Sequence, residues 1–384
     1  MNVRRIAAVA GKEWKETVRN RLFLLMAFVL PSLWMVVFGF GLVFDVEHVP
    51  FAVLDRDQSS LSRDYVYRFI ESRYFDYRGS INDEREIDRM LGDTAIRMVV
   101  VIPERFEEQL LAGRTVTVQT LLDGTFPLHA DTTKGYVIAV NHSFTQELLT
   151  DFLARTRGLA PADARRLAEP VSLETRYLYN EEVRSTWSMV PALIMFSLMV
   201  ASPLLTALGV VREKETGSIY NIYSATVSKA EFLIGKLAPY FAISMINVAL
   251  LWMIAVGFFR VPFKGSLTVF FAASLLFVLC STGIGLIISL LVRTQMAALI
   301  ITIIIAMVPT MVFSGFFTPV SSLSPGAQVQ AHLFPAMYYT DVVRMSFLKR
   351  LDLTIMWMDM LALTGFAVAL PLVAYGLFTK RPKA

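Results

Sequence analysis

The chain has 384 residues, of which 55% are hydrophobic and 18% are charged, and its mean hydropathy is +0.54. This composition is too apolar for a soluble domain of this size. The single cysteine, Cys280, excludes a disulfide framework.

Six charge-poor runs are each long enough to cross a bilayer, which takes about 20 apolar residues. The fifth run is too long for one crossing, and Pro319, three serines and Pro325 interrupt it. We therefore expect residues 318–345 to form an interfacial or re-entrant segment. The six runs are 22–44, 185–211, 237–259, 265–292, 294–340 and 353–378, the last of which contains only Asp359.

Lysine and arginine in the short loops predict the orientation. One face of the membrane receives 14 of them: six before the first span, five in two loops and three in the tail 379–384. The opposite short loops hold five. Both termini are therefore predicted to be cytoplasmic. The net charge of +4 reflects these loops beside anionic lipid, and it implies no nucleic-acid partner.

Residues 1–21 form a predicted amphipathic helix. Apolar side chains recur at helical spacing from Val3 to Val18, with arginine and lysine elsewhere around the helix. We expect the helix to lie along the cytoplasmic interface. The pattern fits two roles for this helix: it only anchors the chain to the membrane, or it also contacts a cytoplasmic partner. Its candidate interfacial residues are Lys12, Glu13, Trp14 and Lys15.

Residues 45–184 are predicted to form one extracytoplasmic α/β domain, with 24 acidic and 17 basic residues. The sequence is thus typical of an α-helical membrane protein, with six transmembrane helices and a mixed α/β domain between spans one and two. Strands are expected at 51–54, 95–102, 116–122 and 171–179. Helices are expected from about Ser59 or Ser60 to Ser72, over 81–91, from Pro103 to near Gly113, and over 132–154.

Catalytic signatures are missing from the sequence. The four histidines have no partners at metal-ligand spacing, and there is no phosphate-binding loop for ATP. Asp55 and Asp57 could suggest a metal, but one intervening residue and no following Gly-containing loop favour turn and capping roles. We therefore expect no catalytic residue and no metal site. Asp359 is expected to be structural or interfacial.

The most informative segment is the loop 212–236 between spans two and three. It begins with alternating charges at the end of a span, and acidic residues contribute little to topology. Ordinary juxtamembrane charge is one interpretation. The other is a short polar elbow that a cytoplasmic motor grips to move a span. The candidate coupling residues are Arg212, Glu213, Lys214, Glu215, Gly217, Glu231, Gly235 and Lys236.

These residues resemble a known family. Arg212-Glu213-Lys214-Glu215-x-Gly217-Ser218-Ile219, followed by Glu231-Phe232-Leu233-Ile234-Gly235-Lys236, resembles the permease subunits of ABC-2 type exporters. Further matches are Val53-Leu54-Asp55-x-Asp57-x-Ser59, Leu122-Asp123-Gly124-Thr125 and Arg176-x-x-Tyr179-Asn180. They occur in the family's order along the whole chain. The chain looks most like the multidrug-type permeases with a long loop after the first span.

The resemblance implies several partners. A separate cytoplasmic ABC-class ATPase would carry ATP and Mg²⁺, so this chain is expected to bind no cofactor. Two permease chains, identical or homologous, would form the transporter, surrounded by membrane lipid; a periplasmic adaptor is a further partner left open. The resemblance also implies a bacterial inner membrane, a coupling role for 212–236, and a first helix that lies beside this elbow. It further implies that 318–345 is an external re-entrant segment that caps the exit path.

Our hypothesis is ATP-driven export of hydrophobic or amphiphilic cargo, such as drugs or lipids. Pro309, Ser314 and Gly315 would let span five kink as the elbows move. One alternative is a membrane-anchored extracytoplasmic sensor or scaffold, disfavoured by the six spans and short cytoplasmic segments. The other is an ion-coupled transporter, disfavoured because the spans carry almost no ionisable residue.

Overall fold

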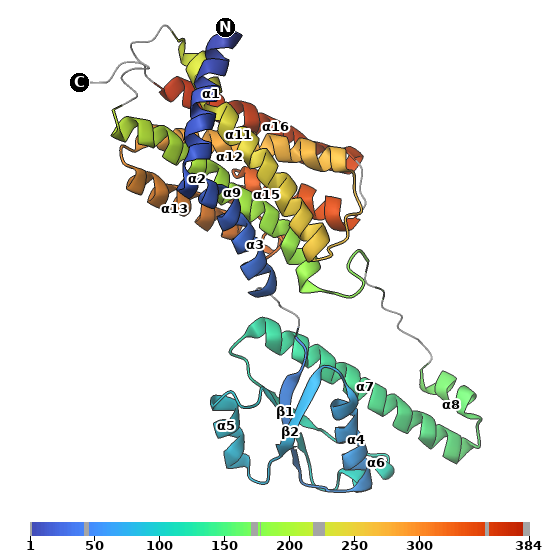
Figure 1. Ribbon diagram of the computed structural model, residues 1–384. Coiled ribbons are helices and arrows are strands. Elements are labelled where there is room, and N and C mark those ends of the chain that lie inside the picture. Colours follow the sequence, from blue (N-terminus) through green and yellow to red (C-terminus); the bar gives the residue numbers. More distant parts are fainter. Residues whose placement is uncertain are drawn as a thin grey trace. The chain divides into compact units, whose positions relative to one another are not determined.

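The computed structural model describes residues 2–41, 46–169, 176, 178–217, 227–349 and 353–378. The chain divides into two compact units (Figure 1). We call Met1–Val43 with Tyr177–Ala384 the helical unit, and Phe44–Arg176 the insertion unit. The insertion unit lies in the sequence between the first two hydrophobic spans.

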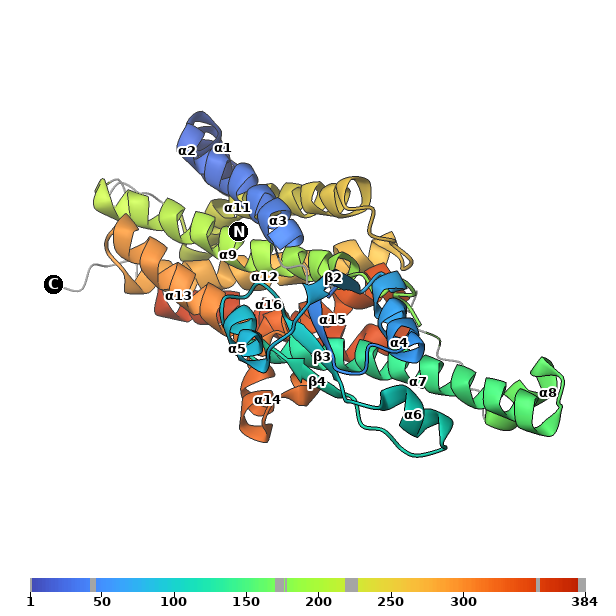
Figure 2. The ribbon, with the colours of Figure 1, turned by 90° about the horizontal axis from the view of Figure 1, so that it is seen from below.

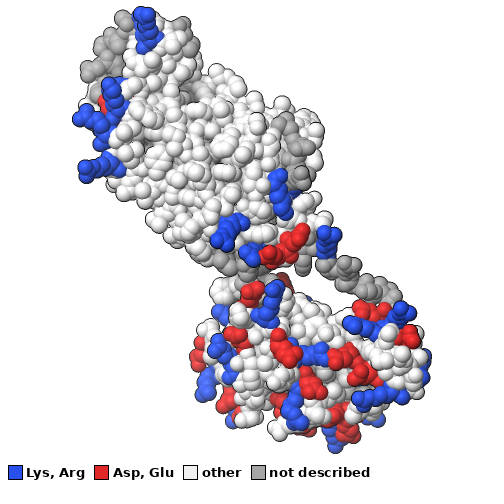
Figure 3. Space-filling model, turned by 45° about the vertical axis from the view of Figure 1, so that its right-hand side comes forward, with Lys and Arg blue, Asp and Glu red and all other residues white. Residues whose placement is uncertain are grey.

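The helical unit contains six helical segments that are long and apolar enough to cross a membrane, as the charge-poor runs predict. Its surface shows a broad uncharged region, with lysine and arginine gathered near the ends (Figure 3). The first span comprises α2 (Arg21–Leu24), the π-helical η1 (Leu25–Val29) and α3 (Leu30–Gly41). The others are α9 (Ser185–Glu215), α11 (Lys229–Met253) with η2 (Ile254–Phe258), α12 (Leu267–Leu291), α13 (Gln295–Phe313) and α16 (Leu353–Leu377).

Helix α9 is the centre of the helical unit. The apolar part of α9 is fully buried, and α9 packs against α3, α11, α12, α13 and α15. Pro191 and Pro203 lie inside α9 without ending it, because neighbouring helices can satisfy the freed backbone groups. The span that leads into the predicted elbow is therefore held by the other helices of its own chain.

A short helical segment separates α13 from α16 and contains no membrane span. It consists of η3 (Val320–Ser322), α14 (Pro325–Ala331), α15 (Pro335–Arg344) and the π-helical η4 (Met345–Lys349). The side-chain oxygens of Tyr339 on α15 and Ser274 on α12 lie 2.8 Å apart in a buried hydrogen bond. Arg344 donates to the Phe316 carbonyl at 2.7 Å. These bonds fix α15 against the bundle.

The insertion unit is built on a four-stranded sheet in the order β2-β1-β3-β4. β1 (Val49–Asp55) pairs in parallel with β2 (Phe75–Ser80) and β3 (Met98–Ile102), and β4 (Gln119–Leu122) is antiparallel to β3. Alternate residues of β1 point to opposite faces. Phe51 and Val53 face one core, whereas Ala52 and Leu54 face the other.

Helices cover both faces of this sheet (Figure 2). On one face lie α4 (Ser60–Glu71), α6 (Phe106–Leu111) and the long α7 (Pro127–Arg157), which contribute Tyr65, Phe69, Phe106 and Phe144 to an aromatic core. On the other lies α5 (Glu84–Gly92), through Ile87. α8 (Pro161–Ala168) packs on α7.

Three expectations for this unit need adjustment. The strand Phe75–Ser80 was not predicted, and its first residue is buried while its neighbours are largely exposed. Helix α7 extends beyond the predicted 132–154 at both ends. The strand expected over 171–179 lies largely outside the described residues, which omit 170–175 and 177.

The turn role of Asp55 and the capping role of Asp57 are confirmed. One Asp55 oxygen accepts the backbone N–H groups of Asp57 and Gln58 at 3.0 Å, and the other accepts the Ser62 hydroxyl at 2.7 Å. Asp57 accepts the N–H groups of Phe106 and Glu107 at the start of α6. Desolvation acts to raise the pKa of Asp57, but the hydrogen bond with the Ser59 side chain and those from the α6 backbone together hold it below its ordinary value.

Candidate coupling junction

The first helix, α1 (Val3–Arg19), crosses the start of α11, and the two helix N-termini meet at Glu231. Glu231 forms a capping box with Ser228 at the start of α11. The same carboxylate accepts the backbone N–H of Asn2, immediately before α1, at 2.6 Å. Arg5 lies 4.0 Å from its other oxygen. One carboxylate therefore satisfies exposed N–H groups of two helices.

Gly235 allows this crossing to be close. A Cβ atom built on Gly235 would lie 2.8 Å from the Val9 Cβ and 2.9 Å from the Ile6 carbonyl oxygen. Both distances are shorter than real Cβ contacts, and one of them involves backbone. The glycine is thus required by the proximity of α1 to α11.

The residue after Gly235, Lys236, forms a buried ion pair with Glu13. The Lys236 Nζ lies 2.5 Å from Glu13 Oε2, and the two side chains are 1% and 5% exposed. The Tyr240 hydroxyl, also buried, donates to the other Glu13 oxygen. A carboxylate removed from water in this way needs both partners.

Glu213 brings the end of α9 into the same network. Its carboxylate lies 3.1 Å from Lys236 Nζ and accepts a hydrogen bond from Lys12 Nζ at 3.0 Å. Desolvation opposes the charge of Lys12, but its hydrogen bond and attraction to Glu213 outweigh this and raise the pKa of Lys12. Helices α1, α9 and α11 are thereby joined through alternating charges.

The next two residues of α9 reach two further spans. Lys214 donates to the carbonyls of Ser289 and Val292 at the end of α12. The Glu215 carboxylate accepts the backbone N–H of Gln295 at 3.0 Å and its side-chain amide at 2.5 Å, at the start of α13. The helix dipole makes a helix C-terminus partly negative and a helix N-terminus partly positive. Lys214 and Glu215 therefore each stabilise the helix end that they contact. Three consecutive residues of α9 therefore contact four other helices.

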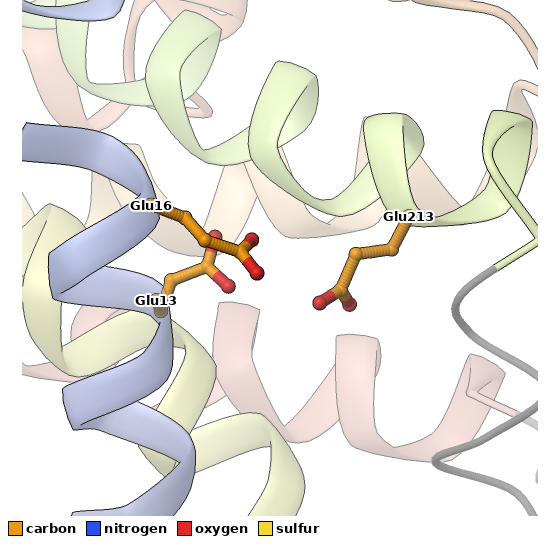
Figure 4. A group of neighbouring side chains, drawn as sticks. All are labelled: Glu13, Glu16 and Glu213. Atoms are coloured by element: carbon orange, nitrogen blue, oxygen red, sulfur yellow. The ribbon is translucent and has the colours of Figure 1, made fainter. Parts of the chain in front are cut away.

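A cavity of about 470 Å³ lies beside this network. Its walls include Lys12, Phe23, Gly209 and Arg212. Glu13 and Glu16 from α1 and Glu213 from α9 point toward one another near this cavity (Figure 4). Since Glu13 and Glu213 are paired with lysines, we interpret the three carboxylates as part of the ion-pair network.

Most of the predicted coupling residues come together in this junction. Arg212 lines the cavity, and Gly217 takes a left-handed φ of +72° just beyond the end of α9, a common helix terminator. Residues 218–226 of the expected elbow lie outside the described residues. Three of the four candidate interfacial residues, Lys12, Trp14 and Lys15, are exposed, and only Glu13 is buried.

The sequence did not predict every side chain that contributes to the junction. Helix α1 exists as predicted, but Glu13 and Thr17 are its buried residues, whereas Val3, Trp14 and Val18 are exposed. Ile6, Ala10 and Glu13 are spaced four and three residues apart, so they lie on the same face of the helix. This spacing is the sequence signal that could have indicated a buried Glu13. Glu13 was singled out as an interfacial residue and not as a buried one, and Asn2, Arg5 and Tyr240 were not singled out.

The three candidate hinge residues lie at the end of α13. Pro309 sits inside the helix, Ser314 follows its last residue, and Gly315 takes a φ of +78°. The Ser314 hydroxyl donates to the Thr310 carbonyl and accepts the Phe316 N–H at 3.2 Å. The helix thus stops at Ser314 through local side-chain capping, and a hinge there remains a prediction.

Comparison with known proteins decides the family. Residues 21–375 match the family described as ABC-2 family transporter protein. The chain belongs to the ABC-2 transporter family. The chain is 29% identical over 346 residues to the probable multidrug ABC transporter permease YbhS of Escherichia coli K12, covering 90% of this chain and 89% of that one. It is 25% identical over 354 residues to the probable multidrug permease YbhR of the same strain, covering 92% of each.

Another relative is about twice as long as the part that this chain matches. The ABC transporter G family member 20 of Dictyostelium discoideum is 19% identical over 96% of this chain, which covers 50% of that protein. The predicted family is thus confirmed, together with a membrane-spanning permease architecture. Permeases of this family lack a catalytic activity of their own.

Proposed function

We propose that this chain is the membrane-spanning permease subunit of an ATP-driven exporter. A separate ABC-class ATPase would bind at the elbow, and a second permease chain would complete the transporter. The distribution of lysine and arginine supports cytoplasmic termini, which puts the coupling junction on the side of ATP and the insertion unit outside. The localisation that follows is a bacterial inner membrane.

The observation that carries this proposal is the path of contacts from the end of α9. Glu213 joins α9 to α1 and α11, and Lys214 and Glu215 join it to α12 and α13. A force applied next to Gly217 would therefore act on several spans together. Such a connection is what a permease without its own ATP site needs.

The cargo is proposed to be hydrophobic or amphiphilic. The described spans expose almost exclusively apolar side chains, including Met296, Ile300, Ile304, Val308 and Val312 along α13. Most of these side chains would face lipid, and those between two permease chains would contact cargo. YbhS and YbhR are named as probable multidrug permeases, and drugs are one of the proposed kinds of cargo.

The test is purification of the chain from native membranes in mild detergent, with identification of its partners by mass spectrometry. We expect an ABC-class ATPase. Its recovery should fall at least tenfold on Glu215→Arg, because Glu215 is exposed beside the elbow. Glu108→Arg, an exposed change in the insertion unit, is the matched control. Recovery of the chain without any ATPase, with transport that survives ATP depletion, would overturn the proposal.

A further inference from the structure

Helix α7 of the insertion unit has two apolar faces. One face packs against the sheet and α4 through Phe144, Tyr136, Val137, Val140 and Leu148. A second face contains Ile138, Leu149 and Phe152, which are 59%, 42% and 54% exposed. Apolar residues on two faces of one helix are typical of a helix with two packing partners. Within the described insertion unit, only the first face is covered.

The exposed face has the spacing of a coiled-coil seam. Its positions recur alternately three and four residues apart over most of the helix, a stretch about 42 Å long at 1.5 Å per residue. All nine positions are exposed. We call them the α7 seam: Leu128, Asp131, Gly135, Ile138, His142, Thr145, Leu149, Phe152 and Thr156.

The α7 seam is complementary to itself in the antiparallel direction. In a single register, Gly135 meets Phe152, Ile138 meets Leu149, and His142 meets Thr145. The smallest residue of the seam thus faces the largest one, and the space above Gly135 is open, since a Cβ there would touch nothing within 4 Å. Large residues opposite small ones are what close helix packing requires.

Charge also favours the antiparallel direction. In the same register, Asp131 meets the Thr156 hydroxyl. A parallel, in-register pair would instead place Asp131 against its own copy, and Gly135 against Gly135. The first contact is repulsive and the second leaves a hole, and both weaken a helix pair. Self-pairing is therefore specific in direction.

We propose that the α7 seam binds the α7 seam of a second copy of this chain, antiparallel and in this register. The proposal rests on the proposed function, in which two permease chains form one transporter, and it adds that the two chains are identical. It also gives the insertion unit a role, which is to hold the two permeases together outside their membrane spans.

Disulfide crosslinking of the full-length chain in membranes tests this pairing. The double variant Ile138→Cys with Leu149→Cys should form a disulfide-linked dimer on mild oxidation, because each cysteine meets the other one across the seam. Each single variant should give at least tenfold less dimer. Two copies of residue 138 would be displaced by about 16 Å along the helices, and a disulfide needs Cα atoms within about 7 Å.

Two controls make the result specific. Ala139→Cys with Thr150→Cys has the same eleven-residue spacing on the flank of α7 and should not crosslink. Adding Gly135→Trp to the reactive double variant should lower its dimer yield, because the tryptophan fills the space that Phe152 of the second copy would occupy. Cys280 is buried and can stay in all variants.

Two outcomes would overturn the proposal. Efficient crosslinking of the single variants would show parallel pairing. A double variant that stays monomeric on oxidation would show that two α7 seams do not pair in this register. Co-purification of the ATPase, measured on the same membranes, separates these results from the proposed function. Recovery of the ATPase with a chain that does not crosslink would contradict only the seam proposal. Crosslinking of the chain without any bound ATPase would contradict only the proposed function.

Discussion

Lys236 on α11 and Glu13 on α1 form a buried ion pair across 223 residues of sequence, with Nζ and Oε2 2.5 Å apart. Glu213 on α9 contacts the same lysine. Burial of isolated charges is strongly unfavourable, so each member of this network depends on the others. The junction is therefore sensitive to the loss of one charge and much less sensitive to the loss of all of them.

Lys236→Met should destabilise the helical unit by about 3–5 kcal/mol, because it leaves Glu13 and Glu213 buried without their shared cation. The triple variant Glu13→Gln, Glu213→Gln, Lys236→Met should recover most of this loss. The measurement is thermal unfolding of the purified chain in detergent. A triple variant less stable than Lys236→Met would contradict the network.

Gly235→Ala should separate α1 from α11, because the added Cβ would lie 2.9 Å from the Ile6 carbonyl oxygen. We expect a loss of about 1–3 kcal/mol and a reduced ATPase rate in the assembled transporter. Gly365→Ala is the control, since a Cβ at Gly365 meets nothing within 4 Å. Equal stability of the two variants would show that the crossing of α1 and α11 is not tightly packed.

Glu215→Ala should lose the hydrogen bonds to the backbone and side-chain amides of Gln295 at the start of α13. We expect ATPase binding to persist in this milder variant while export per ATP hydrolysed falls. Gln295→Ala removes the side-chain bond alone and should have a smaller effect. Unchanged export in both variants would exclude α13 from the coupling path.

The stability of the insertion unit should fall between about pH 4 and pH 2 through Asp123. Hydrogen bonds from Thr125, with the nearby Arg97, lower the pKa of Asp123 from 3.8 to about 2. A lowered folded-state pKa stabilises the fold above pH 3.8, and this contribution is lost as pH falls toward 2. Cleavage of the full chain by pepsin over this range measures the effect. The Asp123→Asn variant should be cleaved faster than the unchanged chain at pH 4, and its cleavage rate should depend less on pH. The same pH profile of cleavage in both proteins would show that Asp123 does not stabilise the insertion unit.

The six spans and the first helix could be predicted because charge-free runs and helical spacing are properties of local sequence. The buried position of Glu13 could not, because a carboxylate in an amphipathic helix normally faces water. Its partner Lys236 lies on another helix, 223 residues away in the sequence. Local sequence patterns do not show which residues so far apart come into contact. The strand Phe75–Ser80 was missed for a similar reason: it contains Asp76, Arg78 and Gly79, and it is recognised as a strand only through its pairing with β1.

The long separation of Glu13 and Lys236 also affects how the protein is made. At typical rates of about 5–20 residues per second, the ribosome needs about 10 to 45 s to add the 223 residues between them. During this time the insertion unit has been synthesised and can fold, whereas Glu13 still has no lysine partner from α11. A chain that stops before its third span would keep this carboxylate unpaired. Docking of the first helix can therefore be completed only after much of the chain has entered the membrane.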